Sequence, residues 1–164
     1  MSDKNPFSPS DEDRHAIWEM LVRRDIRAFV AADWAAHFAD FAPEVFFGID
    51  GRLSEDPDDW RPTYADLERY REAWLAGGTE LAGRIAPADH ERALFGLTSL
   101  KDIEIVNDFA LARKKFDGEI RLESGESVVL RWQTLYFCRR IEGIWRIAGF
   151  LGYLPFTMGR PGRA

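Results

Sequence analysis

His37 is the residue whose place in the sequence most suggests chemistry. On a helix over about residues 26–41, His37 falls within about 20° of the middle of the large apolar face, and Asp33 lies one turn earlier at its edge. An Asp–His pair at this spacing can hydrogen-bond, which fixes the imidazole tautomer and raises its basicity. The pair is a candidate catalytic base, with Asp33 orienting His37. The alternative is a buried structural histidine that Asp33 or a backbone carbonyl satisfies.

Arg71 is a second polar residue on an apolar helix face. It lies about 30° from the middle of the face that the 64–76 helix would bury. A buried guanidinium needs a partner, which could be Asp33, Glu44 or the carboxylate of a ligand. The alternative is that its stem covers the core while its head reaches water.

These residues lead to one main hypothesis and two alternatives. The main hypothesis is an internal cavity that binds a small, largely apolar molecule, with His37 and Arg71 as polar anchors. Its walls would be aromatic side chains, namely Trp34, Phe38, Phe47, Tyr70 and Trp74. One alternative is an acid–base enzyme of the isomerase, dehydratase or cyclase type that uses His37 with Asp33. The other is a non-catalytic dimerising or structural module with a filled core.

Hydrophobic periodicity predicts the elements that would position these side chains. The predicted helices cover residues 11–23, 26–41 and 64–76, with Asp25 as the N-cap of the second. A short strand over 44–49 and a loop over 52–62 precede the third helix, and residues 79–98 contain helical turns after Pro87. The later strands are predicted at 101–106, 109–122, 128–140 and 144–153. Their connecting turns are so short that these strands must pair antiparallel.

This order of elements predicts an α+β fold. N-terminal helices would pack on a strongly curved antiparallel sheet, forming a cone with an internal cavity. A single domain is expected over residues 11–156, with flexible tails at 1–10 and 157–164. Because the segment 128–137 carries apolar residues on both strand faces, we also expect a homodimer through the outer face of the sheet.

Composition narrows the classes of function. A net charge of −6 argues against a nucleic-acid partner, and no apolar run approaches the ~20 residues that span a bilayer. Cys138 is the only cysteine, which favours a reducing cytoplasm and excludes an intrachain disulfide. The histidines are scattered and no Gly-rich phosphate loop occurs, so neither a metal nor a cofactor is expected.

Two stretches of sequence carry a resemblance to a known family. The first is Ala39–Phe47, and the second is Arg131–Ile147, where Glu142-Gly143 turns the chain and a Trp-Arg-Ile triplet starts the last strand. Over roughly residues 11–154 the chain resembles the nuclear transport factor 2-like superfamily, also called cystatin-like, and within it the SnoaL-like branch. The resemblance implies the cone fold. It implies no single activity, because the superfamily includes isomerases, dehydratases, cyclases and non-catalytic binding modules.

The last predicted strand departs from the family pattern. Many relatives carry His or Ser after the Trp of this strand. In this chain residues 148–152 contain no titratable side chain, and Tyr153 is the first one reached. The resemblance therefore gives no support for catalysis from the last strand.

Overall fold

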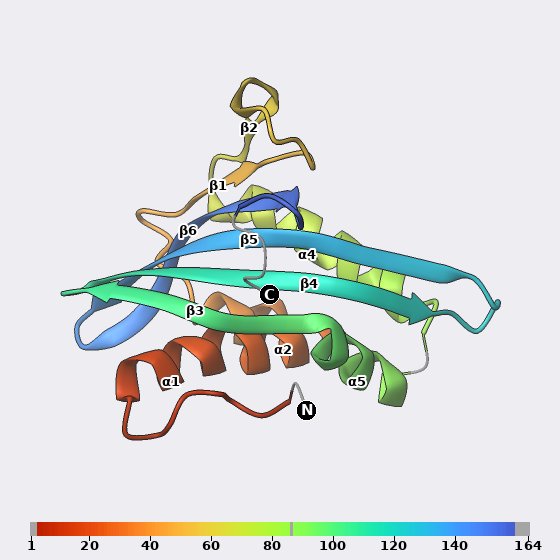
Figure 1. Cartoon of the computed structure of the whole chain (residues 1–164), viewed down its shortest axis with the longest axis horizontal. Helices are drawn as coiled ribbons and strands as arrows, with labels where there is room; N and C mark the ends of the chain where they lie inside the picture. The colour runs from red at the N-terminus through yellow and green to blue at the C-terminus, as the bar shows by residue number, and fades with distance from the viewer. Residues whose placement is uncertain (1–2, 86, 160–164) are drawn as a thin grey trace.

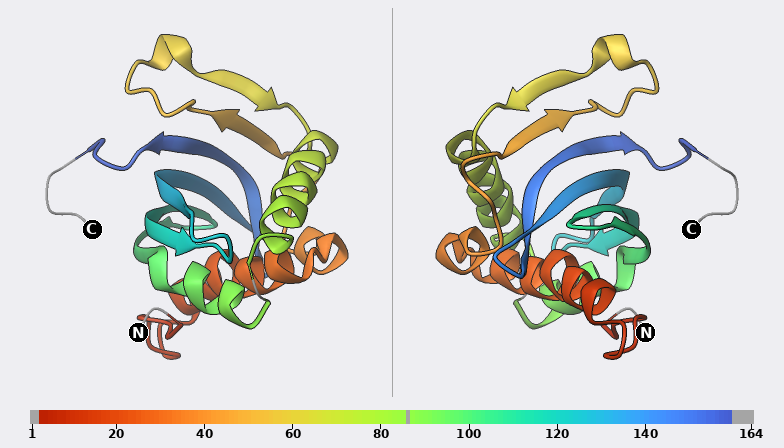
Figure 2. Two further views of the ribbon diagram at one scale, coloured as in Figure 1. Left: turned by 90° about the vertical axis from the view of Figure 1, so that its right-hand side faces the viewer. Right: turned by 90° about the vertical axis from the view of Figure 1, so that its left-hand side faces the viewer.

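The computed structural model describes residues 3–85 and 87–159. It consists of a long curled sheet with helices across its concave side (Figures 1 and 2). The helical segments are α1 (Glu12–Trp18), the π-helix η1 (Glu19–Arg24), α2 (Asp25–Ala31), α3 (Trp34–Phe38), the 3₁₀ turn η2 (Pro57–Asp59), α4 (Leu67–Ala82) and α5 (Pro87–Leu97). The strands are β1 (Phe47–Asp50), β2 (Arg61–Tyr64), β3 (Thr98–Val106), β4 (Phe109–Arg121), β5 (Ser127–Ile141) and β6 (Ile144–Pro155). The α+β cone expected from the sequence is confirmed.

The sheet is mixed rather than wholly antiparallel. Its strand order within the described residues is β2-β1-β6-β5-β4-β3, and the three long hairpins from β3 to β6 pair antiparallel as expected. The exception is β1, which pairs parallel with β6. No hairpin joins these two strands, so turn geometry does not dictate their direction. The approach is so close that a Cβ atom on Gly149 would collide with the Phe47 carbonyl.

The first helical region breaks at a different place from the one predicted. We expected a break near Asp25, but α1, η1 and α2 follow one another directly from Glu12 to Ala31. The break comes at Ala32, which has a left-handed φ of 51°, and Asp33 then caps α3 by accepting from the Ala36 amide. The expected helix over 26–41 is therefore two helices, and Asp25 lies within the first helical run instead of capping the second.

The helix α4 is longer than its sequence indicates. Its N-cap is Asp66, and it runs through Gly77 and Gly78, beyond the predicted end at residue 76. A Cβ atom on Gly78 would lie 3.3 Å from the Phe29 carbonyl, so this glycine permits a close approach of α4 to α2. The helix α4 has 16 residues. No helix in the described part of the chain is long and apolar enough to cross a membrane.

The edge strand β2 was missed because it looks like a loop. It contains Pro62, three of its four residues are exposed, and it follows an Asp-rich turn. Proline is tolerated at a sheet edge, where one side of the strand forms no ladder. Together with β1, this strand forms an arm that projects beyond the rest of the sheet (Figure 2).

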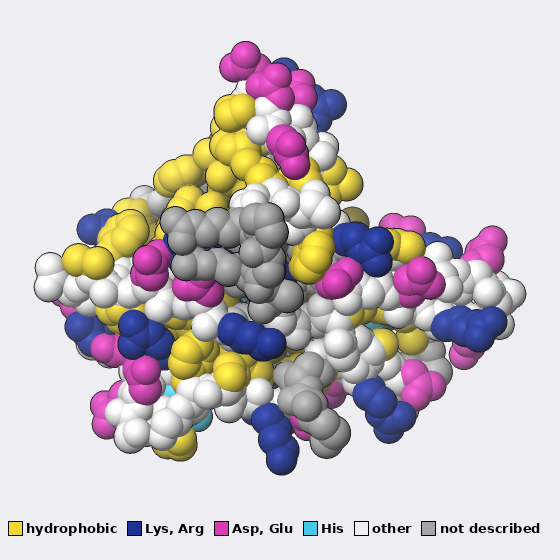
Figure 3. Space-filling view, in the orientation of Figure 1, with side chains coloured by type: hydrophobic (Ala, Val, Ile, Leu, Met, Phe, Trp, Pro, Cys, Tyr) yellow, Lys and Arg dark blue, Asp and Glu magenta, His cyan; other side chains and the backbone are white. Residues whose placement is uncertain are grey.

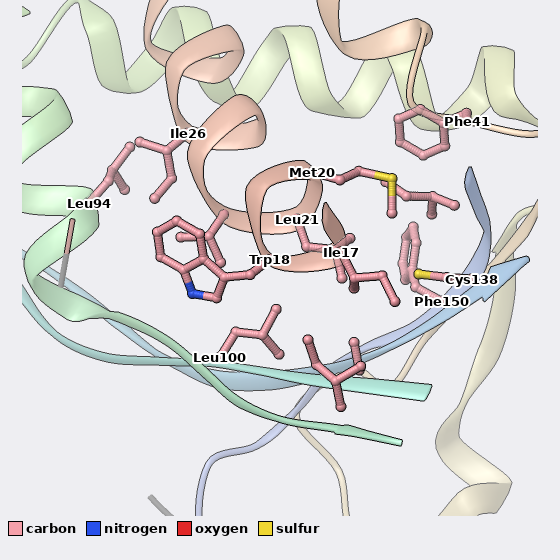
Figure 4. Close-up of a cluster of buried hydrophobic side chains, with 14 of the residues drawn as sticks. Ile17, Trp18, Met20, Leu21, Ile26, Phe41, Leu94, Leu100, Cys138 and Phe150 are labelled. Carbon is pink, nitrogen blue, oxygen red and sulfur yellow. The ribbon is translucent and has the colours of Figure 1, made fainter. Parts of the chain in front are cut away.

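The narrow end of the cone, near the β5–β6 turn, is filled with apolar side chains. Ile17 and Met20 from the first helical run meet Phe41, Cys138 and Phe150 there (Figure 4). Burial raises the pKa of the Cys138 thiol to about 12, which fits an unreactive core residue. We call this region the closed end.

The N-terminal segment is attached to the first helix. Asn5 donates from its side chain to the His15 carbonyl and to Glu19, and Phe7 packs against the core. The outermost parts of the two predicted tails, residues 1–2 and 160–164, lie outside the described residues.

Candidate functional site

The other end of the cone contains a cavity of about 140 Å³ between α2, α4, α5 and the inner face of the sheet. Its wall is mainly aromatic, with Phe29, Tyr70, Trp74, Phe116, Trp132, Tyr136 and Tyr153. Ile26, Leu81, Leu94 and Leu130 add aliphatic surface, and Asp25 is the charged residue in the wall. We call this region the hollow end. Open volume with a mainly apolar lining and a few polar groups is typical of small-molecule sites.

Asp25 is held by three side chains around its carboxylate. The Lys114 ammonium donates to Oδ2 at 2.6 Å, and His37 Nε2 lies 3.4 Å from Oδ1. The Trp74 side chain adds a further hydrogen bond. A carboxylate contacted in this way is fixed in position before any ligand arrives.

Lys114 approaches Asp25 from behind the cavity wall. It points inward from β4, is fully buried, and does not itself line the cavity. Its ammonium also donates to the Leu21 carbonyl at 2.5 Å and lies 5.1 Å from the Phe116 ring centre and 5.9 Å from that of Tyr136. These contacts replace part of the hydration that a buried ammonium loses.

The π-helix η1 directly precedes Asp25 and accounts for the Lys114 contact. In an α-helix the Asp25 amide would donate to the Leu21 carbonyl, four residues back. Here it donates to the Val22 carbonyl, and the Leu21 carbonyl accepts from Lys114. Short π segments within helices occur frequently at functional sites. The irregular turn therefore supplies one of the ligands that hold the ion pair together.

Two opposing effects set the pKa of Asp25. Burial alone would raise it, but the charges of Lys114 and His37, together with hydrogen bonds from Lys114 and Trp74, hold the pKa below its ordinary value. Asp25 is therefore ionised at neutral pH, and its charge is matched by Lys114. An ionised acid of low pKa is a good hydrogen-bond acceptor and a weak base.

His37 is buried, as its position on the helix indicated, but its partner is different from the one predicted. Asp33 is exposed and caps α3, so its side chain accepts a hydrogen bond from the Ala36 amide and none from the imidazole. His37 stacks on Trp74, with ring centres 4.9 Å apart, and faces Asp25. Burial lowers the pKa of His37 and outweighs the attraction of Asp25 and Asp40, so the ring is neutral at pH 7. Its Nδ1 has no hydrogen-bond partner among the described residues.

Three tyrosines, Tyr70, Tyr136 and Tyr153, line the cavity. Burial raises the pKa of Tyr70, Tyr136 and Tyr153, so all three remain neutral phenols at physiological pH. Tyr153 has a left-handed φ of 54° at an irregularity in the β5–β6 pairing, and its side chain hydrogen-bonds that of Tyr64. A non-glycine residue in this conformation is strained, and such strain is concentrated at functional sites.

The structure separates the predicted site residues into two groups. Tyr70 and Trp74 line the cavity, and Trp34 packs against both of them without lining it. Phe38 and Phe47 do not line it, since they are 45% and 48% exposed. The break at Ala32 explains Phe38, because the expected single helix would have carried it on the buried face.

Arg71 is also outside the cavity. Its guanidinium forms an ion pair at 2.8 Å with Glu68, one turn earlier on α4, and its side chain is 42% exposed. The expected pairing with Asp33, Glu44 or a ligand is therefore wrong, and the alternative, a head group that reaches water, describes it.

Several residues of the hollow end were not identified from the sequence. Asp25 was interpreted as a helix cap, and Lys114, Trp132 and Tyr136 were not singled out. One signal was available, because Ala110, Ala112, Lys114 and Phe116 alternate along one strand face, which puts a lysine in an otherwise apolar row. Among the described residues, no group of three His, Cys, Asp or Glu side chains is placed to hold a metal ion.

Comparisons with known proteins identify the fold. No protein-family model matches the sequence, and no curated protein matches it either. Among solved structures, a nuclear transport factor 2-like superfamily protein from Salmonella enterica has a TM-score of 0.57 at 15% identity, covering 96% of this chain and 99% of that one. A protein of unknown function with a cystatin-like fold from Nostoc punctiforme has a TM-score of 0.54 at 13% identity, with 90% and 93% covered.

A third structure agrees with these two. An NTF2-like protein of unknown function from Silicibacter pomeroyi has a TM-score of 0.53 at 14% identity, with 89% of this chain and 98% of that one covered. The chain therefore has the NTF2-like, or cystatin-like, cone fold. Identities this low show the fold and no activity.

Proposed function

We propose that this chain, as a SnoaL-like protein, binds a small, largely apolar molecule in the cavity of its hollow end. The observation that supports this most directly is a partly open cavity of about 140 Å³ with a mainly aromatic wall. An engineered apolar cavity of roughly 150 Å³ in another protein accepts benzene, so a ligand built on a single six-membered ring is the right size. The fold similarity adds no ligand identity, and the proposal rests on the cavity.

The structure gives one argument for the acid–base enzyme and several against it. Asp25 and the phenols of Tyr70, Tyr136 and Tyr153 are polar groups converging on open volume, as an enzyme requires. However, His37 does not line the cavity, Asp33 points elsewhere, and Asp25 is charge-neutralised by Lys114. The geometry therefore favours binding over proton abstraction.

Dimerisation through the outer face of the sheet remains part of the proposal. Phe109 and Ile144 are each about half exposed near the β5–β6 turn, where apolar side chains gather among the charged ones (Figure 3). We expect light scattering to give twice the 18.8 kDa chain mass at micromolar concentration, and Phe109→Glu to give the monomer. The control is Leu53→Glu, an exposed apolar residue on the arm, which should leave the dimer intact. A monomeric wild type at these concentrations would count against the dimer alone.

Binding is tested with toluene as the simplest probe. Methyl NMR should show toluene shifting Ile26, Leu81, Leu94 and Leu130, which line the cavity. Leu130→Trp should fill the cavity and abolish the shifts. Its control is Val129→Trp on the neighbouring residue, which faces outward and is 54% exposed. The proposal fails if millimolar toluene leaves these methyl signals unchanged, or if Leu130→Trp binds toluene as the wild type does.

A further inference from the structure

The hollow end carries two opposite charges in a fixed order, with a carboxylate in the wall and an ammonium behind it. We propose that this arrangement selects neutral ring compounds that bear a hydroxyl group, phenols being the simplest, with the ligand O–H donating to Asp25. This inference rests on the proposed binding function and specifies its ligand class.

The charges of Asp25 and Lys114 disfavour both anionic and cationic ligands. An anionic ligand would meet the Asp25 carboxylate, which lines the cavity. A cationic ligand would find Asp25 already neutralised by Lys114 at 2.6 Å. Two of the aromatic rings in the wall, Phe116 and Tyr136, already lie beside the Lys114 ammonium, which would repel a second cation placed against them. Since like charges repel strongly at short range in a poorly hydrated site, both ions are disfavoured.

Hydrogen-bonding capacity favours a hydroxyl over an ether or a methyl group. A carboxylate has about four acceptor positions, and Lys114, Trp74 and His37 approach three of them. The remaining acceptor capacity belongs to a residue that lines the cavity, and the ligand hydroxyl would use it. The same ligand oxygen can accept from a tyrosine, and Tyr70, Tyr136 and Tyr153 line the same space. A phenol satisfies both requirements with one group on one ring.

The experiment compares four single-ring probes by titration calorimetry at pH 7. Toluene and phenol are nearly the same size and differ in the hydroxyl, while benzylamine is cationic and benzoate anionic at this pH. We expect phenol to bind about 10- to 100-fold more tightly than toluene, the range for a hydrogen bond to a charged acceptor. Benzylamine and benzoate should each bind at least about tenfold more weakly than phenol.

A double variant tests whether the ion pair causes this preference. Asp25→Leu with Lys114→Met removes both charges and keeps an apolar wall, a replacement that buried ion pairs often tolerate. Phenol and toluene should then bind with equal affinity. The matched control is Asp117→Leu with Arg131→Met, which removes a β4–β5 ion pair of 2.9 Å that is about half exposed. That control should keep the wild-type ratio.

The outcomes separate this inference from the binding function. If toluene binds and phenol is no tighter, or if benzylamine or benzoate matches phenol, the selection is overturned while the binding function stands. A double variant that folds and keeps the phenol preference also overturns the role of Asp25. If no probe binds, the binding function and this inference fall together. Because the wild-type ratios are decisive by themselves, a double variant that does not fold leaves the test intact.

Discussion

The two ends of the cone are built from the same helices and strands but are filled differently. At the closed end, Ile17, Met20 and Phe150 pack to a continuous apolar core (Figure 4). At the hollow end, a few residues further along the same helical run and strands, Asp25 lines open volume and pairs with the buried Lys114 behind it. The hollow end could be packed as tightly as the closed end, since the fold requires neither a void nor a buried charge. The difference puts tight packing at one end and open volume at the other, which is the end where we propose that a ligand binds.

The largest effect expected at the hollow end comes from breaking its ion pair. Lys114→Met leaves the Asp25 carboxylate without its ammonium, which should lower the free energy of unfolding by about 3–5 kcal/mol. Urea denaturation measures this loss. Arg131→Met is the control, because its ion pair with Asp117 is exposed and should contribute about 1 kcal/mol or less. Equal losses in the two variants would mean that Lys114 is not the partner that stabilises Asp25.

The second-largest effect is expected from truncating apolar side chains, which should cost more stability at the closed end than at the hollow end. Met20→Ala at the closed end creates a new cavity in packed surroundings and should cost about 2–5 kcal/mol. Leu130→Ala enlarges a cavity that already exists, so fewer contacts are lost and about 1 kcal/mol is expected. Thermal and urea unfolding of both variants checks the ranking. A loss for Leu130→Ala as large as that for Met20→Ala would show that the hollow end is packed in solution.

The smallest effect concerns pH and His37. Because the folded state lowers the pKa of His37 below 6.5, the unfolded chain takes up a proton first as the pH falls. This contribution to stability is fully present above pH 6.5 and is lost as the pH falls through the folded-state pKa. We expect His37→Leu to flatten the dependence by up to about 1.4 kcal/mol per pH unit.

The window for this measurement is pH 7.5 to about 5. The folded state lowers the pKa of Asp25 and of Glu19 below the ordinary values of 3.8 and 4.5, so these carboxylates affect the stability mainly below pH 5. His90, whose pKa burial also lowers, contributes equally to both proteins and cancels in the difference. Parallel stability curves for the two proteins would refute the assignment.

The long strands β4 to β6 could be predicted from the sequence, whereas the edge strand β2 and the helix boundaries could not. Alternation and turn residues are local signals, so β4 to β6 were found within two residues of their observed ends. The break at Ala32 has no such signal, because alanine is a good helix former and its left-handed φ is imposed by the surrounding structure. The continuation of α4 past Gly77 also lacks a local signal, and at Gly78 the helix packs closely against Phe29.

The errors at Asp33, His37 and Phe38 follow from the break at Ala32. With a single helix over 26–41, Asp33 and His37 share a face; with a break at Ala32, Asp33 becomes a cap and Asp25 becomes the partner of His37. The aromatic residues on α4, Tyr70 and Trp74, were placed correctly because the phase of that helix was right. Lys114 joins Asp25 across 89 positions of sequence, a contact that no local pattern reveals.

The π-helix also affects how sequence changes act on this chain. It widens one turn just before Asp25, and removing a single residue from Glu19–Arg24 would restore regular α-helical hydrogen bonding. The six residues of the π segment rotate the chain about as far as five residues of an α-helix do, so Asp25 would keep its place on the helix face. The Leu21 carbonyl, however, would return to the regular helical ladder, and Lys114 would lose the acceptor that the π segment leaves to it. A one-residue deletion would thus loosen the buried ammonium behind Asp25 without changing any residue of the cavity wall.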